Sequence, residues 1–247
     1  DIVSMVDCIL YDCWDGSECD WNDDGIINIL DIIATVSCII EDCAIFGCTD
    51  PIAGNYSTHN NIDNGSCVYS DIDGNIFSTI IIGDQLWMAE NMRVAHYKNG
   101  EPIVLITSNQ EWGELSSGAY GNYGDNSDYI DFYGYLYNWY AVDDDRGICP
   151  DGWQVPTDEV WMELEIFLGM SPEEAQEIGL RGTDEGGKLK STGTIEGEDG
   201  LWYEPNEGAT NESGFTARPG GYRDGVDGLY FDMGYYGSFW SSTPFGI

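Results

Sequence analysis

Side chains that carry oxygen recur at fixed spacing across residues 20–31. They stand at positions 1, 3, 5, 9 and 12 of this stretch, while Gly25 occupies position 6, where the chain must turn sharply. Because a hard cation takes about six or seven oxygens, this spacing predicts a calcium-binding loop. An Asx-rich surface turn is the alternative, but it would not require the apolar helix that follows. The predicted ligands are Asp20, Asn22, Asp24, Ile26 (through its backbone carbonyl), Asn28 and Asp31.

The charge balance is strongly acidic, with 45 Asp and Glu residues against 8 Lys and Arg residues and a formal charge of −37. Such a field repels nucleic acids and anionic membranes, so neither is expected as a partner. It suits an extracellular medium, where cations screen the repulsion. No apolar stretch approaches the ~20 residues of a membrane span and no signal peptide is present, so we expect a processed, secreted chain.

Seven of the eight cysteines fall within the first 67 residues. Such density in a segment too small for a large core predicts a disulfide framework in an oxidising compartment. A zinc site is disfavoured, because the sequence has no C-x-x-C pair and only two histidines, His59 and His96.

Residues 1–13 and 31–43 are two copies of one pattern, offset by thirty positions. Both place apolar residues at i, i+1, i+4, i+7 and i+8, which is the stripe of an amphipathic helix. Each helix is too short to be stable alone, so the two stripes are expected to pack together. The copies make Cys8 and Cys38 equivalent, and we expect a Cys8–Cys38 bridge, although sequence alone leaves the connectivity open.

A calcium loop that runs into an Ile-rich helix, repeated thirty residues apart, resembles a type I dockerin repeat pair. The resemblance implies a small all-α, EF-hand-like module over residues 1–46. Its first loop is missing, and Asp1 matches the last ligand of that loop. Cohesin is the partner that the resemblance implies, but we favour packing of the helices within the chain as a calcium-stabilised spacer.

Residues 47–69 form a connector rich in Gly, Asn, Asp, Ser and Thr. Such a composition does not make a core, so a Cys48–Cys67 disulfide is predicted to close it, at a gain of about 3 kcal/mol. The segment resembles the short acidic, cysteine-bounded repeats of secreted bacterial proteins, which are akin to thrombospondin type 3 repeats. A second calcium site and ordinary turn chemistry explain its polar residues equally well. The candidate ligands are Asp50, Asn55, Asp63 and Asn64.

From residue 70 onward the sequence becomes β-rich. Residues 71–75 carry a hairpin turn signal ahead of the β-branched run 76–82. A capped helix is predicted over residues 158–168, and the capping box at 171–174 opens a second, short helix. The predicted fold class is α+β, with short strands, two helices and long loops.

Six motifs in this region stand out. They are GDQLWMAENMR (83–93), YGYLYNWYAV (133–142), ICPDGWQVPTDEVWMELE (148–165), GGKLKS (186–191), NESGFTARPGGYR (211–223) and FWSST (239–243). In this order they cover nearly all of residues 70–247, which therefore resemble the Fibrobacter succinogenes major paralogous domain. That family is grouped with C-type-lectin-like folds, and its members mostly lack a known activity, so the resemblance implies a fold without a chemistry.

Members of this family continue past the last motif into further strands that end in a cysteine. The resemblance therefore implies that the domain lacks its last strands. It also implies that Cys149 lacks its usual partner, unless Cys149 pairs with Cys19. An unclosed sheet edge would invite pairing with another chain.

The sequence shows no catalytic constellation. Cys149 needs a base to act as a nucleophile, and neither histidine can be placed beside it. Sulfatase-modifying enzymes share a related fold, but they need a reactive cysteine pair that we do not find. Paired carboxylates could hydrolyse glycosides, but among 45 acidic residues some pair will be close by accident. We therefore expect a protein that is not an enzyme.

Ligand binding is the favoured use of the 9 Trp and 16 Tyr residues. Aromatic rings stack on sugar faces and also serve protein interfaces. Five motif tryptophans are expected in the core: Trp87, Trp139, Trp153, Trp161 and Trp240. Aromatic residues in polar loops are expected to be exposed: Trp112, Trp202, Tyr203, Tyr222, Tyr230, Tyr235 and Tyr236.

Lectin-like folds often bind calcium through a Glu-Pro-Asn triplet, and residues 204–206 form one beside Trp202. A turn built on the proline explains the triplet as well. The candidate ligand-binding residues are Trp202, Tyr203, Glu204, Asn206, Tyr235 and Tyr236.

Together these features predict a secreted, calcium-stabilised modular protein that serves binding or adhesion. Its ligand would be a glycan or an extracellular surface protein. The parts are the dockerin-like module (1–46), the connector (47–69) and the lectin-like domain (70–247). The alternative is a structural subunit of an extracellular fibre or surface assembly, in which neighbouring copies exchange strands.

Overall fold

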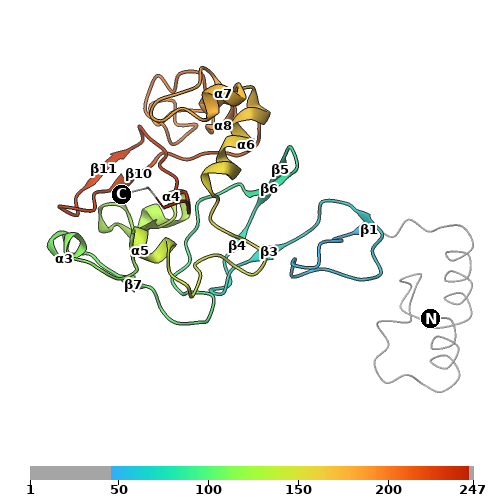
Figure 1. The fold of residues 1–247 in the computed structure, drawn as a ribbon, viewed down its shortest axis with the longest axis horizontal. Coiled ribbons are helices and arrows are strands. Elements are labelled where there is room, and N and C mark those ends of the chain that lie inside the picture. The colour runs from blue at the N-terminus through green and yellow to red at the C-terminus, as the bar shows by residue number, and fades with distance from the viewer. Residues whose placement is uncertain (1–45, 245–247) are drawn as a thin grey trace, which may run out of the picture. The chain divides into compact units, whose positions relative to one another are not determined.

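The computed structural model describes residues 46–244 (Figure 1). The predicted calcium loop, the two amphipathic helices and the Cys8–Cys38 pair lie outside these residues and stay predictions. The described part divides into two compact units. The smaller unit includes residues 46–51 and 55–67, and the larger includes residues 52–54 and 68–244.

The small unit lies within the predicted connector and has little regular structure. Strand β1 (Phe46–Gly47) pairs in parallel with β2 (Ile62–Asp63). A disulfide joins Cys48 to Cys67 over a sequence separation of 19, which confirms the predicted closure of this loop. Among the described residues of this unit, the disulfide joins the two ends of the loop 48–67 covalently.

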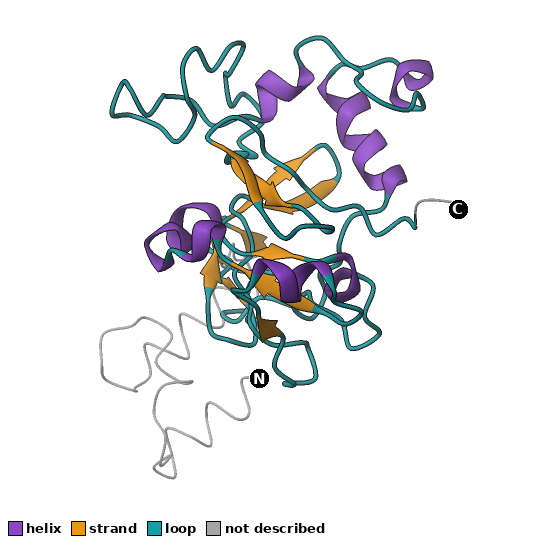
Figure 2. Cartoon of the chain, turned by 90° about the vertical axis from the view of Figure 1, so that its left-hand side faces the viewer, coloured by secondary structure: helices purple, strands orange, loops and turns teal. Residues whose placement is uncertain are grey.

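The large unit is a mixed α+β domain of short elements joined by long loops, as Figure 2 shows. Its strands are β3 (Tyr69–Ser70), β4 (Ile76–Phe77), β5 (Thr79–Ile82), β6 (Gln85–Met88), β7 (Val104–Leu105), β8 (Ala119–Gly121), β9 (Leu136–Tyr137), β10 (Gly220–Arg223) and β11 (Tyr230–Met233). They pair as β3–β4, β5–β6, β7–β8–β9 and β10–β11. The β7–β8 pair is parallel, and the others are antiparallel.

The two predicted helices are present, and side chains cap both of them. Thr157 Oγ1 accepts the Val160 N–H at the start of the first, and Ser171 Oγ accepts the Glu174 N–H at the start of the second. The α-helices of the large unit are α3 (Asn109–Gly113), α4 (Ile130–Tyr133), α5 (Trp139–Val142), α6 (Asp158–Leu168), α7 (Pro172–Ala175) and α8 (Glu185–Leu189). Two 3₁₀ turns, η1 (Tyr123–Asp125) and η2 (Ser127–Tyr129), precede α4.

The prediction of only two helices is wrong for the described range. The four helices that it missed, α3, α4, α5 and α8, have four or five residues each. A single turn is too short to show the 3.6-residue apolar period, and tertiary contacts must stabilise it.

The turn predicted at residues 71–75 is confirmed, because Asp71 Oδ1 accepts the backbone N–H groups of Asp73 and Asn75. The β-branched run that follows is not a single strand. The run is interrupted at Ser78, whose N–H donates to the side chain of Glu90 (Oε1) at 2.8 Å instead of to a strand. The residues before Ser78 form β4, which pairs with β3, and the residues after it form β5, which pairs with β6.

Aromatic rings build the main core. Trp87 of β6 packs on Trp161 of α6 with ring centroids 4.9 Å apart, and Phe215 lies 5.5 Å from Trp87. Leu164 fills the centre of this cluster at 1% exposure. Core burial is confirmed for Trp87, but the expectation is wrong for Trp240. That ring is 43% exposed, and its Nε1 donates to the carbonyl of Tyr137.

Replacing both Cys48 and Cys67 by serine is expected to lower the unfolding free energy of the small unit by about 3 kcal/mol. The reason is that the unfolded chain regains the entropy that loop closure removed. Hydrogen exchange of residues 46–67 measures this change. The Cys149→Ser variant, which removes a thiol without a disulfide, is the control and should leave exchange in this segment unchanged. Equal protection with and without the bridge would contradict the prediction.

Candidate ligand-binding surface

The β10–β11 hairpin has one buried face and one exposed face. Its register pairs Tyr222 directly with Phe231. Since side chains alternate along a strand, Arg223 points to the face opposite Tyr222. Arg223 is 8% exposed, whereas Tyr222 and Phe231 are 39% and 38% exposed. The hairpin therefore presents an aromatic pair outward while it anchors a cation inward.

The guanidinium of Arg223 binds backbone carbonyls. Its Nη1 donates to the Ile106 carbonyl and its Nε to the Gly228 carbonyl. Nη2 makes longer bonds to the Thr107 carbonyl and to Asn109 Oδ1, at 3.4 and 3.3 Å. Burial is the main cause that lowers the pKa of Arg223. The planar fork of donors suits such a cluster of fixed acceptors, which a lysine could not match.

Two aromatic rings enclose the same guanidinium. Its central carbon lies 4.2 Å from the Trp112 ring centroid and 4.5 Å from that of Tyr230. The prediction that Trp112 is exposed is therefore wrong, because this contact leaves the ring 4% exposed. The hydroxyl of Tyr230 donates to Asp125 Oδ1 at 2.9 Å, and burial is the main cause that raises the pKa of Tyr230.

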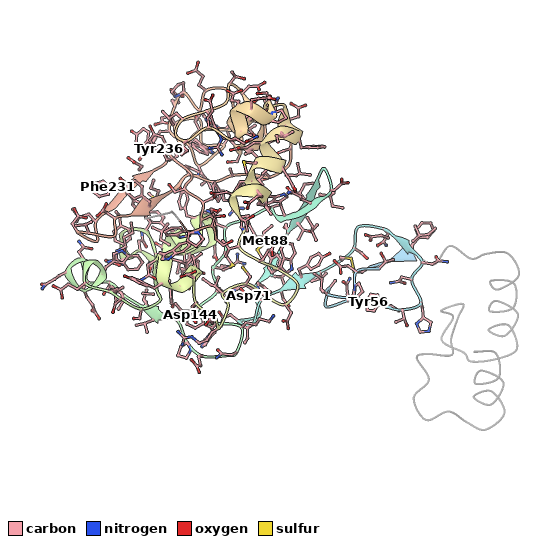
Figure 3. All side chains as sticks on the ribbon, in the orientation of Figure 1. Tyr56, Asp71, Met88, Asp144, Phe231 and Tyr236 are labelled. Atoms are coloured by element: carbon pink, nitrogen blue, oxygen red, sulfur yellow. A yellow bond between two sulfur atoms is a disulfide. The ribbon has the colours of Figure 1, made fainter. Side chains whose placement is uncertain are left out.

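Further aromatic rings lie on the exposed side. The rings of Tyr203 and Tyr235 are in contact, with centroids 4.7 Å apart and planes tilted by 31°. Tyr235 is 60% exposed and Tyr236 is 64% exposed. Figure 3 labels Phe231 and Tyr236, which both lie at the outer edge of the large unit. We call the set Tyr203, Tyr222, Phe231, Tyr235 and Tyr236 the tyrosine platform.

Backbone contacts fix the platform in place. The Tyr203 N–H donates to the Gly234 carbonyl at 2.8 Å, and the Gly221 N–H donates to the Tyr236 carbonyl at 2.9 Å. Gly234 has a φ of 86°, and a Cβ at this position would lie 2.4 Å from the Tyr203 ring. Only glycine allows the ring to approach the backbone so closely. The rings are thus held by the fold before any ligand binds.

The structure separates the predicted ligand-binding residues into two groups. Tyr203, Tyr235 and Tyr236 lie in the platform, and Glu204 is exposed beside it. The prediction that Trp202 is exposed is wrong, because this residue is 6% exposed. The reason is a pair of contacts absent from its local sequence. Trp202 Nε1 donates to Ser191 Oγ at 2.9 Å, and the Lys190 ammonium lies 4.6 Å from its ring centroid.

In the Glu204-Pro205-Asn206 triplet, the side-chain amide of Asn206 does not point to solvent. Asn206 Nδ2 donates to the carbonyls of Ser191 and Gly193, at 3.1 and 2.9 Å. These bonds turn the side chain toward the protein, so its structural use is to join two loops.

The candidate ligands of a second calcium all lie in the small unit. Asp63 Oδ1 accepts the Gly65 N–H and Asn64 Oδ1 accepts the Ser66 N–H, both of which are Asx turns. Asn55 Nδ2 donates to the Ser66 carbonyl. Turn chemistry thus accounts for Asp63 and Asn64. In the part of the chain that the structure describes, no group of three or more His, Cys, Asp or Glu side chains is arranged to hold a metal ion.

A cleft of about 660 Å³ opens elsewhere in the large unit. Residues of β6, β9, α6 and the segments 148–156 and 215–221 line it, and Trp240 stands in its wall. Cys149 also lines it, and burial raises the pKa of this thiol to about 12. The thiol is therefore protonated at neutral pH and is a poor nucleophile.

Comparison with known proteins identifies the class of this chain. The family of the Fibrobacter succinogenes major domain matches residues 80–246. The chain belongs to this family, which confirms that part of the resemblance seen in the sequence. Searches of curated proteins and of solved structures found no match. Among residues 46–244, no helix combines the length and the apolar character that crossing a bilayer requires.

Replacing Arg223 by methionine is expected to lower the free energy of unfolding by about 3 kcal/mol. Two buried carbonyls would lose their donor, and two rings would lose their cation. Urea denaturation followed by tryptophan fluorescence measures the change. The Arg223→Lys variant should recover less than half of the loss. Lys98→Met, which removes a cation that is 49% exposed, is the control and should change stability by less than about 1 kcal/mol. A fully stable Arg223→Met protein would contradict this assignment.

Proposed function

We propose that this chain is a secreted, calcium-stabilised modular binding protein whose tyrosine platform binds a glycan. The proposal rests on one observation: the contact between the half-buried Tyr203 and the exposed Tyr235, whose ring centroids lie 4.7 Å apart. Large exposed aromatic groups in a soluble fold mark sites of interaction. No reaction is assigned to the platform, and its role is to bind.

The chemistry around the platform favours a neutral sugar. Aromatic faces offer flat apolar contact to a pyranose ring, and their hydroxyl groups add polar contacts. Asp232 and Glu204 are exposed carboxylates close by in the sequence that can accept hydrogen bonds from sugar hydroxyls. With a formal charge of −37, the chain would repel an anionic polysaccharide. An extracellular protein surface is the other ligand class that the same rings support.

The finer fold assignments belong to the same proposal. The family whose motifs the chain carries is grouped with C-type-lectin-like folds. Together with the α+β structure of residues 68–244, this grouping supports a lectin-like domain that displays the platform. The sequence of residues 1–46 supports a dockerin-like calcium module ahead of it. Calcium and disulfides would then stabilise parts of the chain that are too small for a core, in an extracellular setting.

Changing Tyr235 to alanine is expected to weaken glycan binding about tenfold, because it removes the more exposed ring of the Tyr203–Tyr235 pair. Tyr235→Phe keeps the ring and should lose little. A neutral glycan array identifies the strongest ligand, and calorimetry on that oligosaccharide measures the dissociation constants. Tyr56→Ala changes an exposed tyrosine of the small unit and serves as the matched control.

Two results would contradict the proposal that the tyrosine platform binds a glycan. One is that no neutral glycan on the array retains the wild-type protein. The other is an equal loss of affinity in Tyr235→Ala and Tyr56→Ala, since the effect would then not be specific to the Tyr203–Tyr235 pair.

Calcium binding is expected to depend on Asp24 and not on its neighbour Asp23. Asp24 stands at ligand position 5 of the predicted loop, whereas Asp23 stands at position 4, which supplies no ligand. At a calcium concentration of about 100 times the dissociation constant, binding should stabilise the module by about 2.7 kcal/mol. Calorimetry and thermal unfolding with and without chelator test this in Asp24→Ala and Asp23→Ala. Equal affinities of the two variants would contradict the loop assignment.

The second candidate function is that of a structural subunit in an extracellular assembly. The observation that favours it is the cleft of about 660 Å³ in the large unit, which is lined mostly by apolar and aromatic residues.

A further inference from the structure

Two strands contribute all of their residues to the lining of the cleft of the large unit. All four residues of β6 line it, and so do both residues of β9. Successive side chains of a strand point to opposite faces. The cleft therefore touches residues from both faces of β6.

Within residues 46–244, β6 has a strand partner on one side only, because it pairs with β5 alone. β9 pairs with β8 alone, but its Tyr137 carbonyl already accepts the Trp240 Nε1–H group, so the proposal rests on the edge of β6. An unpaired strand edge carries a row of N–H and C=O groups that can pair with another extended chain. The four residues of β6 offer an edge of about 13 Å, which matches about four residues of an added strand.

Two amide side chains in the cleft are already engaged inside the protein. Gln85 Nε2 donates to Glu163 Oε2 at 2.9 Å, and Asn91 Nδ2 donates to the Tyr133 carbonyl at 2.9 Å. These groups have little capacity left to bind sugar hydroxyls. Most of the remaining lining is apolar, and its largest side chains are Trp87, Trp161, Phe215, Phe239 and Trp240.

We propose that this cleft accepts an extended strand donated by another polypeptide. The added strand would pair with the edge of β6 and bury its alternate apolar side chains against the aromatic lining. Such strand addition draws affinity from main-chain hydrogen bonds and specificity from the pockets for alternate side chains. This site is separate from the tyrosine platform, and it favours the assembly function.

Charge complementarity determines the composition of the donor strand. The lining holds two carboxylates, Glu90 and Glu163, and one guanidinium, Arg218. Glu90 is paired with Arg93 at 2.8 Å, so Glu163 and the formal charge of −37 of the whole chain are what favour a basic partner. An acidic strand would be repelled as it approached, whereas Lys or Arg at the polar positions would be attracted. The expected donor is therefore a basic strand that alternates apolar and polar residues.

Binding of synthetic peptides to the full chain tests this inference. The probes are fluorescent eight-residue peptide libraries with alternating apolar and polar positions, in which the polar positions carry either Lys and Arg or Glu. We expect enrichment from the basic library and none from the acidic one. An N-methylated copy of the best peptide keeps its side chains but lacks alternate N–H donors, so it should bind at least about tenfold more weakly.

The structure offers a matched pair of protein variants. Leu86 of β6 and Ile81 of β5 are directly paired across the hairpin, but only Leu86 lines the cleft. Leu86→Lys should lose at least about tenfold in affinity for the basic peptide, and Ile81→Lys should retain it. Tyr235→Ala should bind the peptide normally, so a failure of the glycan proposal is distinguishable from a failure of this one.

Three results would overturn the proposal. They are no enrichment from the basic library, equal binding of the N-methylated peptide, and an equal loss of affinity in Leu86→Lys and Ile81→Lys.

Discussion

The buried guanidinium of Arg223 is the interaction on which the arrangement around the β10–β11 hairpin depends. It joins β10 to the segment before α3, across 117 positions of sequence. Strands of two to four residues form few ladder hydrogen bonds, so the large unit relies on side chains that bind distant carbonyls. Asn91 and Trp240 do the same, through the carbonyls of Tyr133 and Tyr137. Each of these contacts satisfies backbone groups that a larger sheet would have paired.

The anchor on one face of the hairpin is what makes the other face useful. With Arg223 held inward between two rings, strand alternation turns Tyr222 outward against Phe231. The loop after β11 returns close enough for the Gly221 N–H to bind the Tyr236 carbonyl. Exposed rings on a fixed backbone lose little conformational freedom when they bind, which is the physical reason to regard the platform as a recognition surface.

The sequence predicted the features whose cause is local. The caps of α6 and α7, the Asp71 turn and the Cys48–Cys67 closure all follow from residues within about one turn or one loop of each other. Predictions failed where burial depends on distant segments. Trp112 and Trp202 sit among polar neighbours in sequence, yet a cation from another segment covers Trp112, and Lys190 and Ser191 cover Trp202. The sequence identified Tyr203 and Tyr235 as candidate ligand-binding residues, but it could not predict that their two rings are in contact.

By itself the sequence determined the family, the α+β class, the acidic charge and the Cys48–Cys67 disulfide, because each is encoded in residue type and short-range spacing. Only the tertiary structure decided which aromatic rings reach the surface and which strands line the cleft. The physical reason is that exposure is a property of what packs over a residue. In a domain of short strands and long loops, the covering group comes from a segment that local sequence does not specify.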